Sequence, residues 1–273
     1  MIVLKLNISI MAKSNVEYRD YSNANQKVIE TYKLNHINQT YDYVSQMEKQ
    51  YDTKNKLLGI WDAIELADTI IDESDPDINL PQIYHSIQTA EGLRKLYPNN
   101  KDLHLVGLIH DLGKVMLLDD FGKLPQWSVV GDTFPVGCKF SDKIVFSEFF
   151  ADNSDNYNHN FNTKHGIYEP HCGLDNVAFS WSHDKYLYDV LKNSKISQIG
   201  LNIIRYHSFY AFHKDNEYEY LANENDMILK SHLQVFSKCD LYNKDNNNKL
   251  DIDEFKPYYG ELIDEYCPGK FYF

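Results

Sequence analysis

The sequence predicts an all-α fold, a single-domain helical bundle, from three observations. After Tyr18, apolar residues recur at three- and four-residue spacing, which is the period of an amphipathic helix. Alternating apolar and polar runs, which would indicate strands, are nearly absent. The connections between the periodic stretches, such as "DESDPDINLP" and "YEPHCGLD", are rich in residues that favour turns.

Eight helices are expected in chain order, each defined by an apolar stripe and bounded by polar or turn-forming segments. Their ranges are 25–50, 58–72, 82–97, 101–117, 183–193, 196–207, 226–239 and 252–266. "DESDPDINLP" separates the second from the third, and "FGKLPQWSVVGDTFPVGC" ends the fourth. The Asn-rich stretch 152–162 precedes the fifth helix and is expected to be a solvated surface insertion. "NKDNNNK" separates the last two helices.

The N-terminal segment, residues 1–16, is predicted to be a weakly ordered tail, and residues 17–273 to be the single domain. Lys5 and Asn7 interrupt its apolar part, and no basic region precedes it, which argues against a signal sequence. No apolar run reaches the roughly 18 residues that a membrane span needs. The four cysteines are far apart without a C-x-x-C pair, which favours reduced thiols and a cytoplasmic location.

The charge of the chain limits its partners. The formal net charge is -13, and nucleic acid and anionic membranes are polyanions, so neither is an expected partner. We expect a monomer that binds a small polar molecule.

Several predicted helices place a metal-binding type of side chain on the stripe that faces the core. In "DLHLVGLIHDLGK", Leu103, Val106 and His110 are separated by three and four residues and share one helix face. A single inward histidine is usually a hydrogen-bonded core residue. Asp111 follows directly, however, and a buried carboxylate is costly unless a cation or partner compensates it.

The same phase recurs on other helices, and five helices that each direct a His or Asp inward are difficult to explain by core packing. The candidate donors are His85, His110, Asp111, His183, His207 and Asp240. Four imidazoles and two carboxylates exceed what one ion needs and suit two ions with a bridging carboxylate. Nitrogen and oxygen donors without thiolate fit iron, manganese or zinc. The sequence therefore predicts a buried di-metal centre.

Other polar residues are interpreted as structural. Asp184 lies about 100° around its helix from the inward-facing His183, so we expect it in solvent. Five histidines lie off the apolar stripes or in polar loops and are expected at the surface: His36, His104, His159, His165 and His232.

Longer stretches of the chain resemble a known family. A His, a His-Asp pair about 25 residues later and a distant Asp form the metal signature of HD-domain proteins, carried here by His85, His110, Asp111 and Asp240. "TYKLNHINQTYDYV", "QTAEGLRK", "HLVGLIHDLGKV", "PQWSVVGDTFPVGC", "RYHSFY" and "PYYGELIDEYCPG" resemble myo-inositol oxygenase, over about Tyr18 to Phe273. The resemblance implies a non-haem di-iron enzyme with an Fe(II)/Fe(III) pair. It implies that O2 is a co-substrate in a four-electron cleavage of the myo-inositol ring to D-glucuronate.

Carried over by motif, the resemblance makes the six donors iron ligands, with Asp111 as the bridge and Lys114 as a further catalytic group. The implied substrate-binding residues are Arg19, Asp72, Lys114, Gly131, Asp132, Ser208 and Lys244, with Tyr32 helping to cover the pocket. An uncharged hexol offers only hydroxyls, which suit fixed donors and acceptors. The chain departs from the family at Ser182, at Cys239 and in its "KFYF" ending, none of which removes a donor.

Two other functions remain open from the residues alone. An HD-type metal-dependent phosphohydrolase acting on a nucleotide or phosphoester explains four of the donors but not His183 and His207. It also predicts a Lys/Arg cluster for phosphate, of which the net charge of -13 gives little sign. The second alternative is a metal-binding protein without catalysis. For calcium, "NKDNNNKLDIDEF" aligns to an EF-hand loop but has Asn243 at its first position and Asn248 in place of glycine.

Overall fold

The computed structural model describes residues 21–75, 82–242 and 251–273, and it confirms the all-α fold. In these residues the α-helices are α1 (Gln26–Asn38), α2 (Tyr41–Gln50), α3 (Ile60–Ala67), α4 (Gln82–Leu96), α5 (Lys101–Ile109), α6 (His183–Leu191), α7 (Gln198–Tyr206), α8 (Tyr210–His213), α9 (Glu224–Tyr242) and α10 (Ile252–Tyr266). Short 3₁₀ helices supplement them: η1 (Leu112–Leu117), η2 (Asp119–Phe121), η3 (Gln126–Ser128), η4 (Ser147–Asp152), η5 (Ser154–Tyr157) and η6 (Leu174–Asn176). The two strands are β1 (Leu57–Leu58) and β2 (Phe271–Tyr272).

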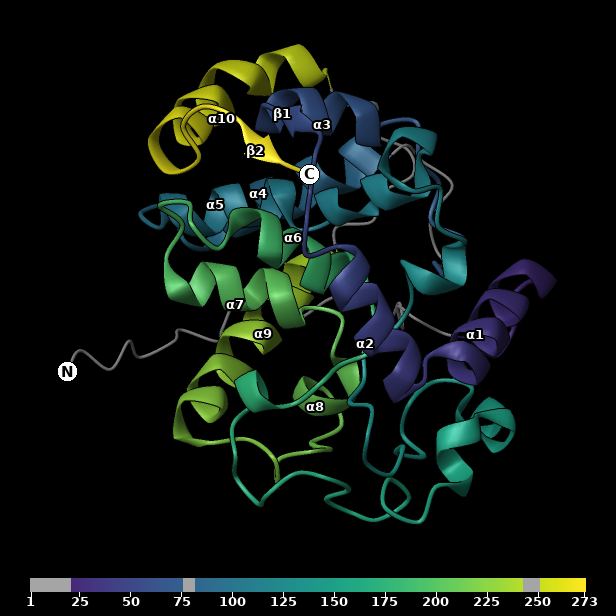
Figure 1. Cartoon of the computed structure of the whole chain (residues 1–273). Coiled ribbons are helices and arrows are strands. Elements are labelled where there is room, and N and C mark those ends of the chain that lie inside the picture. The colour runs from purple at the N-terminus through teal and green to yellow at the C-terminus, as the bar shows by residue number, and fades with distance from the viewer. Residues whose placement is uncertain (1–20, 76–81, 243–250) are drawn as a thin grey trace.

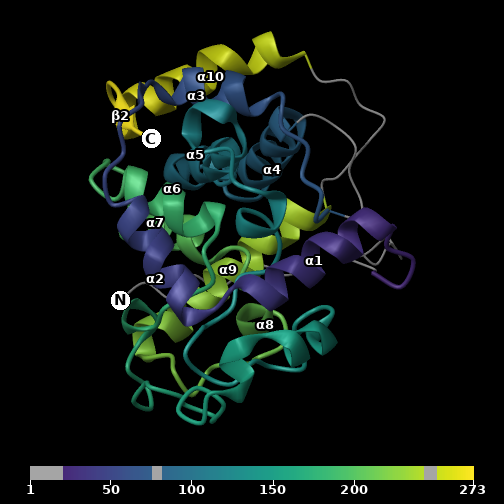
Figure 2. The same cartoon turned by 45° about the vertical axis from the view of Figure 1, so that its right-hand side comes forward.

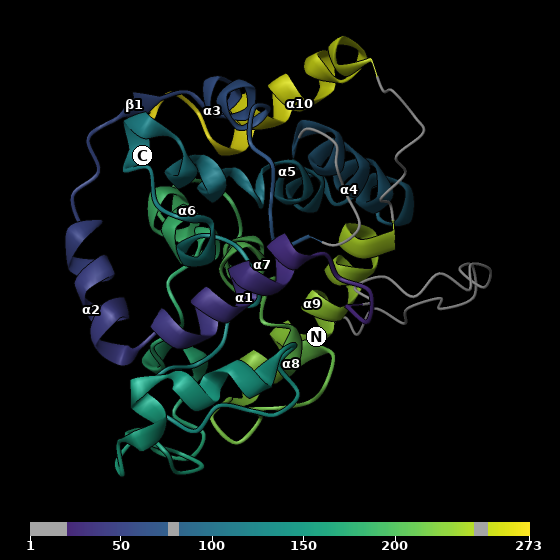
Figure 3. The ribbon, with the colours of Figure 1, turned by 90° about the vertical axis from the view of Figure 1, so that its right-hand side faces the viewer.

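The helices form a central group between two outer regions. α10 and α3 lie together at one end of the molecule, at the top of Figures 1 and 2. α8 and the long teal and green loops that precede α6 lie at the opposite end. Between them, α4 packs against α5 and α9, and α7 packs against α6 and α9. α1 lies outside this group, at the right in Figure 1 and toward the viewer in Figure 3.

Close helix contacts keep the central group compact. A Cβ atom at Gly107 of α5 would lie 2.9 Å from the Cα atom of Ala90 in α4, so a larger residue there would separate the two helices. Ile87 and Leu93 of α4 and Leu108 of α5 are fully buried. This packing holds α4, which carries His85, at a fixed distance from α5, which His110 directly follows.

The C-terminus returns to the segment that follows α2. β1 and β2 pair antiparallel, with Leu57 opposite Tyr272 and Leu58 opposite Phe271. The N–H of Phe273 also donates to the carbonyl of Lys56 at 2.8 Å. The "KFYF" ending is therefore fixed to the surface of the bundle by backbone hydrogen bonds.

Two predicted helices differ from the structure. The helix predicted over 25–50 is wrong, because Gln39 leaves the helical conformation and the Thr40 side chain caps a new helix by accepting the N–H of Tyr43. The helix predicted over 101–117 ends as an α-helix at Ile109 and continues as η1. The remaining ranges agree with α3, α4, α6, α7, α9 and α10 within a few residues, except that α3 ends earlier than expected.

The Asn-rich stretch 152–162 is not simply a solvated insertion. Its distal part is exposed, but Asn153 is fully buried and donates to the carbonyls of His36 and Gln39 at 2.7 and 3.1 Å. The Asp155 carboxylate accepts the N–H of Tyr41 at 2.7 Å. These contacts satisfy backbone groups that the break between α1 and α2 leaves unpaired.

The expectation that His36 and His104 lie at the surface was wrong, since both are fully buried. Their ring nitrogens are satisfied internally: Nε2 of His36 contacts the carbonyl of Val145, and Nε2 of His104 contacts that of Tyr97. His159 and His232 are exposed, and His165 is half-buried. Internal hydrogen bonds allow polar side chains to be buried away from the predicted stripes.

All four cysteines are free thiols. Among the described helices, none is both long and apolar enough to span a lipid bilayer.

Candidate metal centre

Six elements direct side chains into one buried site. His85 comes from α4, His183 from the start of α6, and Asp240 from α9. His110 and His207 are the residues that directly follow α5 and α7, and Asp111 immediately precedes η1. All six predicted donors are at most 8% exposed. The convergence expected from helix phase is therefore present in the fold.

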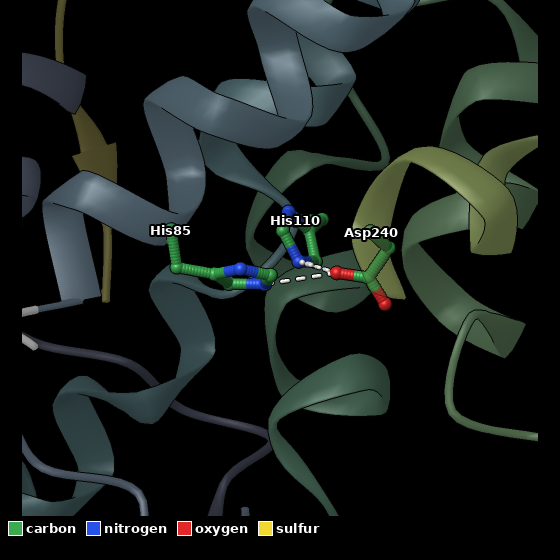
Figure 4. Close-up of side chains that lie close together, drawn as sticks. All are labelled: His85, His110 and Asp240. Carbon is green, nitrogen blue, oxygen red and sulfur yellow. Dashed lines mark ion pairs between the residues drawn. The ribbon is translucent and has the colours of Figure 1, made fainter. Parts of the chain in front are cut away.

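One half of the site joins α4, α5 and α9. Figure 4 shows the imidazoles of His85 and His110 facing a single oxygen of Asp240. The Nε2 atoms lie 2.8 and 3.3 Å from this Oδ1 atom, respectively. These three residues could hold one metal ion.

The other half joins α6 and α7. The Nε2 atoms of His183 and His207 lie 3.3 Å apart. Oδ1 of Asp111 lies 3.0 Å from Nε2 of His183 and 3.6 Å from that of His207. This pair of imidazoles offers a second place for a cation.

Asp111 lies between the two halves. Its Oδ1 atom faces His183 and His207, whereas Oδ2 lies 3.4 Å from Nε2 of His110 and 3.8 Å from that of His85. Burial opposes the charge on this carboxylate, yet His110 and Lys114 hold its pKa well below the usual value. A carboxylate with one oxygen toward each imidazole pair has the geometry of a bridging ligand.

The hydrogen bonds of the imidazoles fit a metal centre. Nδ1 of His110, His183 and His207 contacts the carbonyl of Gly107, Val129 and Ile204, respectively, at 2.7–2.9 Å. A carbonyl only accepts, so each Nδ1 carries a proton, and Nε2 is the ring atom left to bind a metal ion. The Nε2 atoms of His183 and His207, 3.3 Å apart, can share either a proton or a metal cation. The donor set therefore suits two bound metal ions.

A cavity opens beside this cluster and contains most of the predicted substrate residues. It is partly open to solvent and lies directly against the six donors. Besides the six donors, the predicted residues that line it are Tyr32, Asp72, Lys114, Gly131 and Ser208. A partly enclosed site with several convergent polar groups suits a small polar ligand.

Lys114 lies between the six candidate donors and the cavity. Its ammonium group lies 2.9 Å from Oδ2 of Asp111 and 2.8 Å from Oδ2 of Asp72. Burial opposes the charge on Lys114, but Asp111 and Asp72 raise its pKa above the usual value. Burial likewise opposes the charge on Asp72, and Lys114 lowers the pKa of that carboxyl. All three groups are thus held in their charged forms.

Tyr32 of α1 lines the cavity. Its hydroxyl donates to Oδ1 of Asp132 at 3.0 Å and lies 2.9 Å from the hydroxyl of Tyr21. Gly131 has a φ of 100°, a conformation that disfavours other residues, and its position faces the ring of Tyr32. Asp132 does not line the cavity itself but contacts it through Tyr32.

Two predicted residues, Arg19 and Lys244, lie outside the described residues. Two that the sequence analysis missed belong to the site. Asp184, expected in solvent, is fully buried and lies 3.1 Å from Nε2 of His183, so that expectation was wrong. Gln82 donates to Oδ2 of Asp111 and is buried one helical turn before His85.

Sequence signals for both missed residues exist. Asp184 follows a donor histidine directly, as Asp111 does, and Gln82 shares a helix face with His85 at a spacing of three.

The fold and the cluster define an all-helical protein with a buried His/Asp centre for a pair of metal ions. A comparison with known proteins identifies its family: the family model described as myo-inositol oxygenase matches residues 25–273. The chain belongs to the myo-inositol oxygenase family.

The chain is similar to inositol oxygenases from several organisms. The chain is 51% identical over 256 residues to a probable inositol oxygenase of Oryza sativa subsp. japonica, covering 93% of this chain and 83% of that one. It is 47% identical over 267 residues to the inositol oxygenase of Dictyostelium discoideum, covering 95% and 91%. It is 46% identical over 263 residues to that of Danio rerio, covering 94% and 93%.

Proposed function

We propose that this chain is an inositol oxygenase that cleaves the ring of myo-inositol to D-glucuronate with O2 as co-substrate. The observation that carries the proposal is Asp111, whose two oxygens face separate imidazole pairs beside a partly open cavity. Two iron ions at the six donors would supply the redox chemistry, which this reaction needs because inositol has no group that hydrolysis could release. Membership in the family supports this assignment.

The residues around the cavity suit a neutral polyol. The Lys114 ammonium can donate to a substrate oxygen and stabilise negative charge on it, because Asp72 and Asp111 keep the group protonated. Ser208 provides a hydroxyl in the cavity wall, and Gly131 provides backbone close to the ligand. Tyr32 and Asp132 would cover the bound substrate and limit the entry of water. Arg19 and Lys244 are proposed as further substrate contacts.

The test is O2 uptake by Fe(II)-reconstituted protein with and without myo-inositol, with glucuronate measured in the same sample. The proposal expects equal amounts of O2 consumed and glucuronate formed, and no uptake without the polyol. An Asp111→Asn variant serves as the matched control and should show neither. Metal-loaded protein that consumes no O2 but hydrolyses phosphate esters would overturn the proposal in favour of a phosphohydrolase.

A further inference from the structure

We propose that Asp184 is a positioning residue that fixes the direction of the Ser208 hydroxyl and thereby selects the substrate group that Ser208 can bind. This role rests on the proposed function, because it concerns how the same cavity recognises a polyol. Asp184 is fully buried at the start of α6 and does not line the cavity. It therefore acts on the substrate only through its neighbours.

Ser208 is held by Asp184 through two hydrogen bonds. The backbone N–H of Ser208 donates to Oδ2 of Asp184, and its hydroxyl donates to Oδ1, both at 3.1 Å. The carbonyl of Ser208 accepts the N–H of Thr133 at 3.0 Å, which fixes the residue from its other side. The serine thus has little freedom to turn.

The direction of the hydroxyl follows from its single proton. A serine hydroxyl has one proton and two lone pairs, and an ionised carboxylate can only accept. The proton of Ser208 is therefore directed toward Asp184, and its lone pairs remain for the cavity that Ser208 lines. The substrate group beside Ser208 must then be a donor. An alcohol satisfies this requirement, whereas a ketone or a fluorine at the same carbon does not.

Replacing the carboxylate by an amide should reverse this polarity. In Asp184→Asn, the N–H of Ser208 requires the amide oxygen at the position of Oδ2, because a donor must face an acceptor. The amide nitrogen then occupies the position of Oδ1 and donates to the Ser208 oxygen. The hydroxyl proton of Ser208 is released toward the cavity, where it can donate to a ketone or fluorine.

The same substitution also affects the candidate metal centre. Oδ1 of Asp184 lies 3.1 Å from Nε2 of His183, so an amide nitrogen there faces the second imidazole pair. Metal content must therefore be measured for each variant alongside ligand binding. This measurement separates a change in Ser208 from a loss of the centre.

The experiment uses iron-loaded protein and myo-inositol analogues in which one hydroxyl at a time is replaced by a carbonyl oxygen or by fluorine. Dissociation constants are measured by calorimetry and by competition with myo-inositol. For the wild-type protein, one ring position should show binding weaker by about tenfold or more, because a buried group is left unpaired there. In Asp184→Asn, the penalty at that position should disappear or reverse, while the order of the other analogues stays the same.

Ser208→Ala supplies a second, independent variant that removes the hydroxyl altogether. It should also lessen the penalty at the same ring position, and adding Asp184→Asn to it should change selectivity no further. Uniformly weaker binding in Asp184→Asn with an unchanged order of analogues would show a purely structural role and overturn the inference. Equally tight binding of all analogues by the wild-type protein would also overturn the inference. This outcome does not depend on whether Asp184→Asn folds.

The two proposals fail in different ways. Wild-type protein that neither binds nor oxidises myo-inositol overturns the proposed function. Normal turnover of myo-inositol with equal tolerance of all analogues overturns only the role of Asp184.

Discussion

Buried Lys114 and half-buried Asp72 form an ion pair, with the ammonium nitrogen 2.8 Å from the carboxylate oxygen. The partners lie on different segments, since Lys114 belongs to η1 and Asp72 follows α3. Because the same ammonium also contacts Asp111, it joins the substrate cavity to the proposed bridging ligand.

Lys114→Ala is expected to retain two metal ions per chain and to lower kcat about 100-fold or more, because a positioned donor is lost from the cavity. Half-buried Asp72 would then lose its cation, so some loss of stability is also expected. Metal analysis, steady-state kinetics and thermal unfolding measure the three effects. Lys123→Ala removes an exposed lysine from the same region of the chain and is the control. Unchanged kinetics in Lys114→Ala would contradict the role of this lysine.

Asp111→Ala is expected to lower the metal content from two ions per chain to one or none, because both halves of the site lose an oxygen. Elemental analysis after dialysis against a weak chelator measures the loss. Asp240→Ala is the matched comparison, since Asp240 contacts the imidazoles of His85 and His110 in one half and its loss should spare the other half. Two tightly held ions in Asp111→Ala would rule out the bridge.

Gly113→Ala should destabilise the protein and disturb the metal centre together. A Cβ atom there would lie 2.1 Å from the carbonyl oxygen of His183, so η1 and α6 must separate. We expect a loss of about 3 kcal/mol in the free energy of unfolding. Weaker binding of the ion beside His183 should accompany it. Chemical denaturation and metal titration provide the readouts.

Gly260→Ala is the control for Gly113→Ala, because nothing lies within 4 Å of a Cβ atom there. In the interior of α10, alanine should be neutral or stabilise the protein by about 0.5–1 kcal/mol. Equal stability of the two variants would show that the contact between η1 and α6 is not tight.

Protonation of His104 should lower the free energy of unfolding as the pH decreases. Burial lowers the pKa of this imidazole from 6.5, the value expected in the unfolded chain. The neutral ring fits its site, since Nε2 contacts the carbonyl of Tyr97 and Nδ1 contacts the hydroxyl of Tyr258. Because the pKa is lower in the folded state, the unfolded state binds more protons as pH falls below about 6.5. The contribution is therefore complete above this pH and lost below it.

His104→Gln is expected to show a shallower decrease in unfolding free energy between about pH 7.5 and 5.5 than the wild type, because glutamine does not titrate there. Urea titrations at several pH values measure the slope. His159→Gln, at an exposed position, is the control and should keep the wild-type slope. A slope in His104→Gln identical to that of the wild type would show that His104 does not contribute to the pH dependence of stability.

The sequence by itself determined the all-α fold and the six candidate donors. Both depend on local periodicity: residues three and four apart share a helix face whatever the helix packs against, so inward-pointing His110, His207 and Asp240 were visible in the pattern. Phase has limits even there, because Ile199 shares a helix face with Ile203 and His207 at a spacing of four and is nevertheless 46% exposed.

Only the tertiary structure decided which polar groups meet across elements. Asp184 and His104 were expected at the surface, yet both are buried because Ser208 and Tyr258 supply partners from distant parts of the chain. The break at Gln39 is likewise stabilised by Asn153, more than a hundred residues away. Helical phase gives the direction of a side chain from its own helix axis, whereas burial of a polar group depends on hydrogen-bond partners that other segments provide.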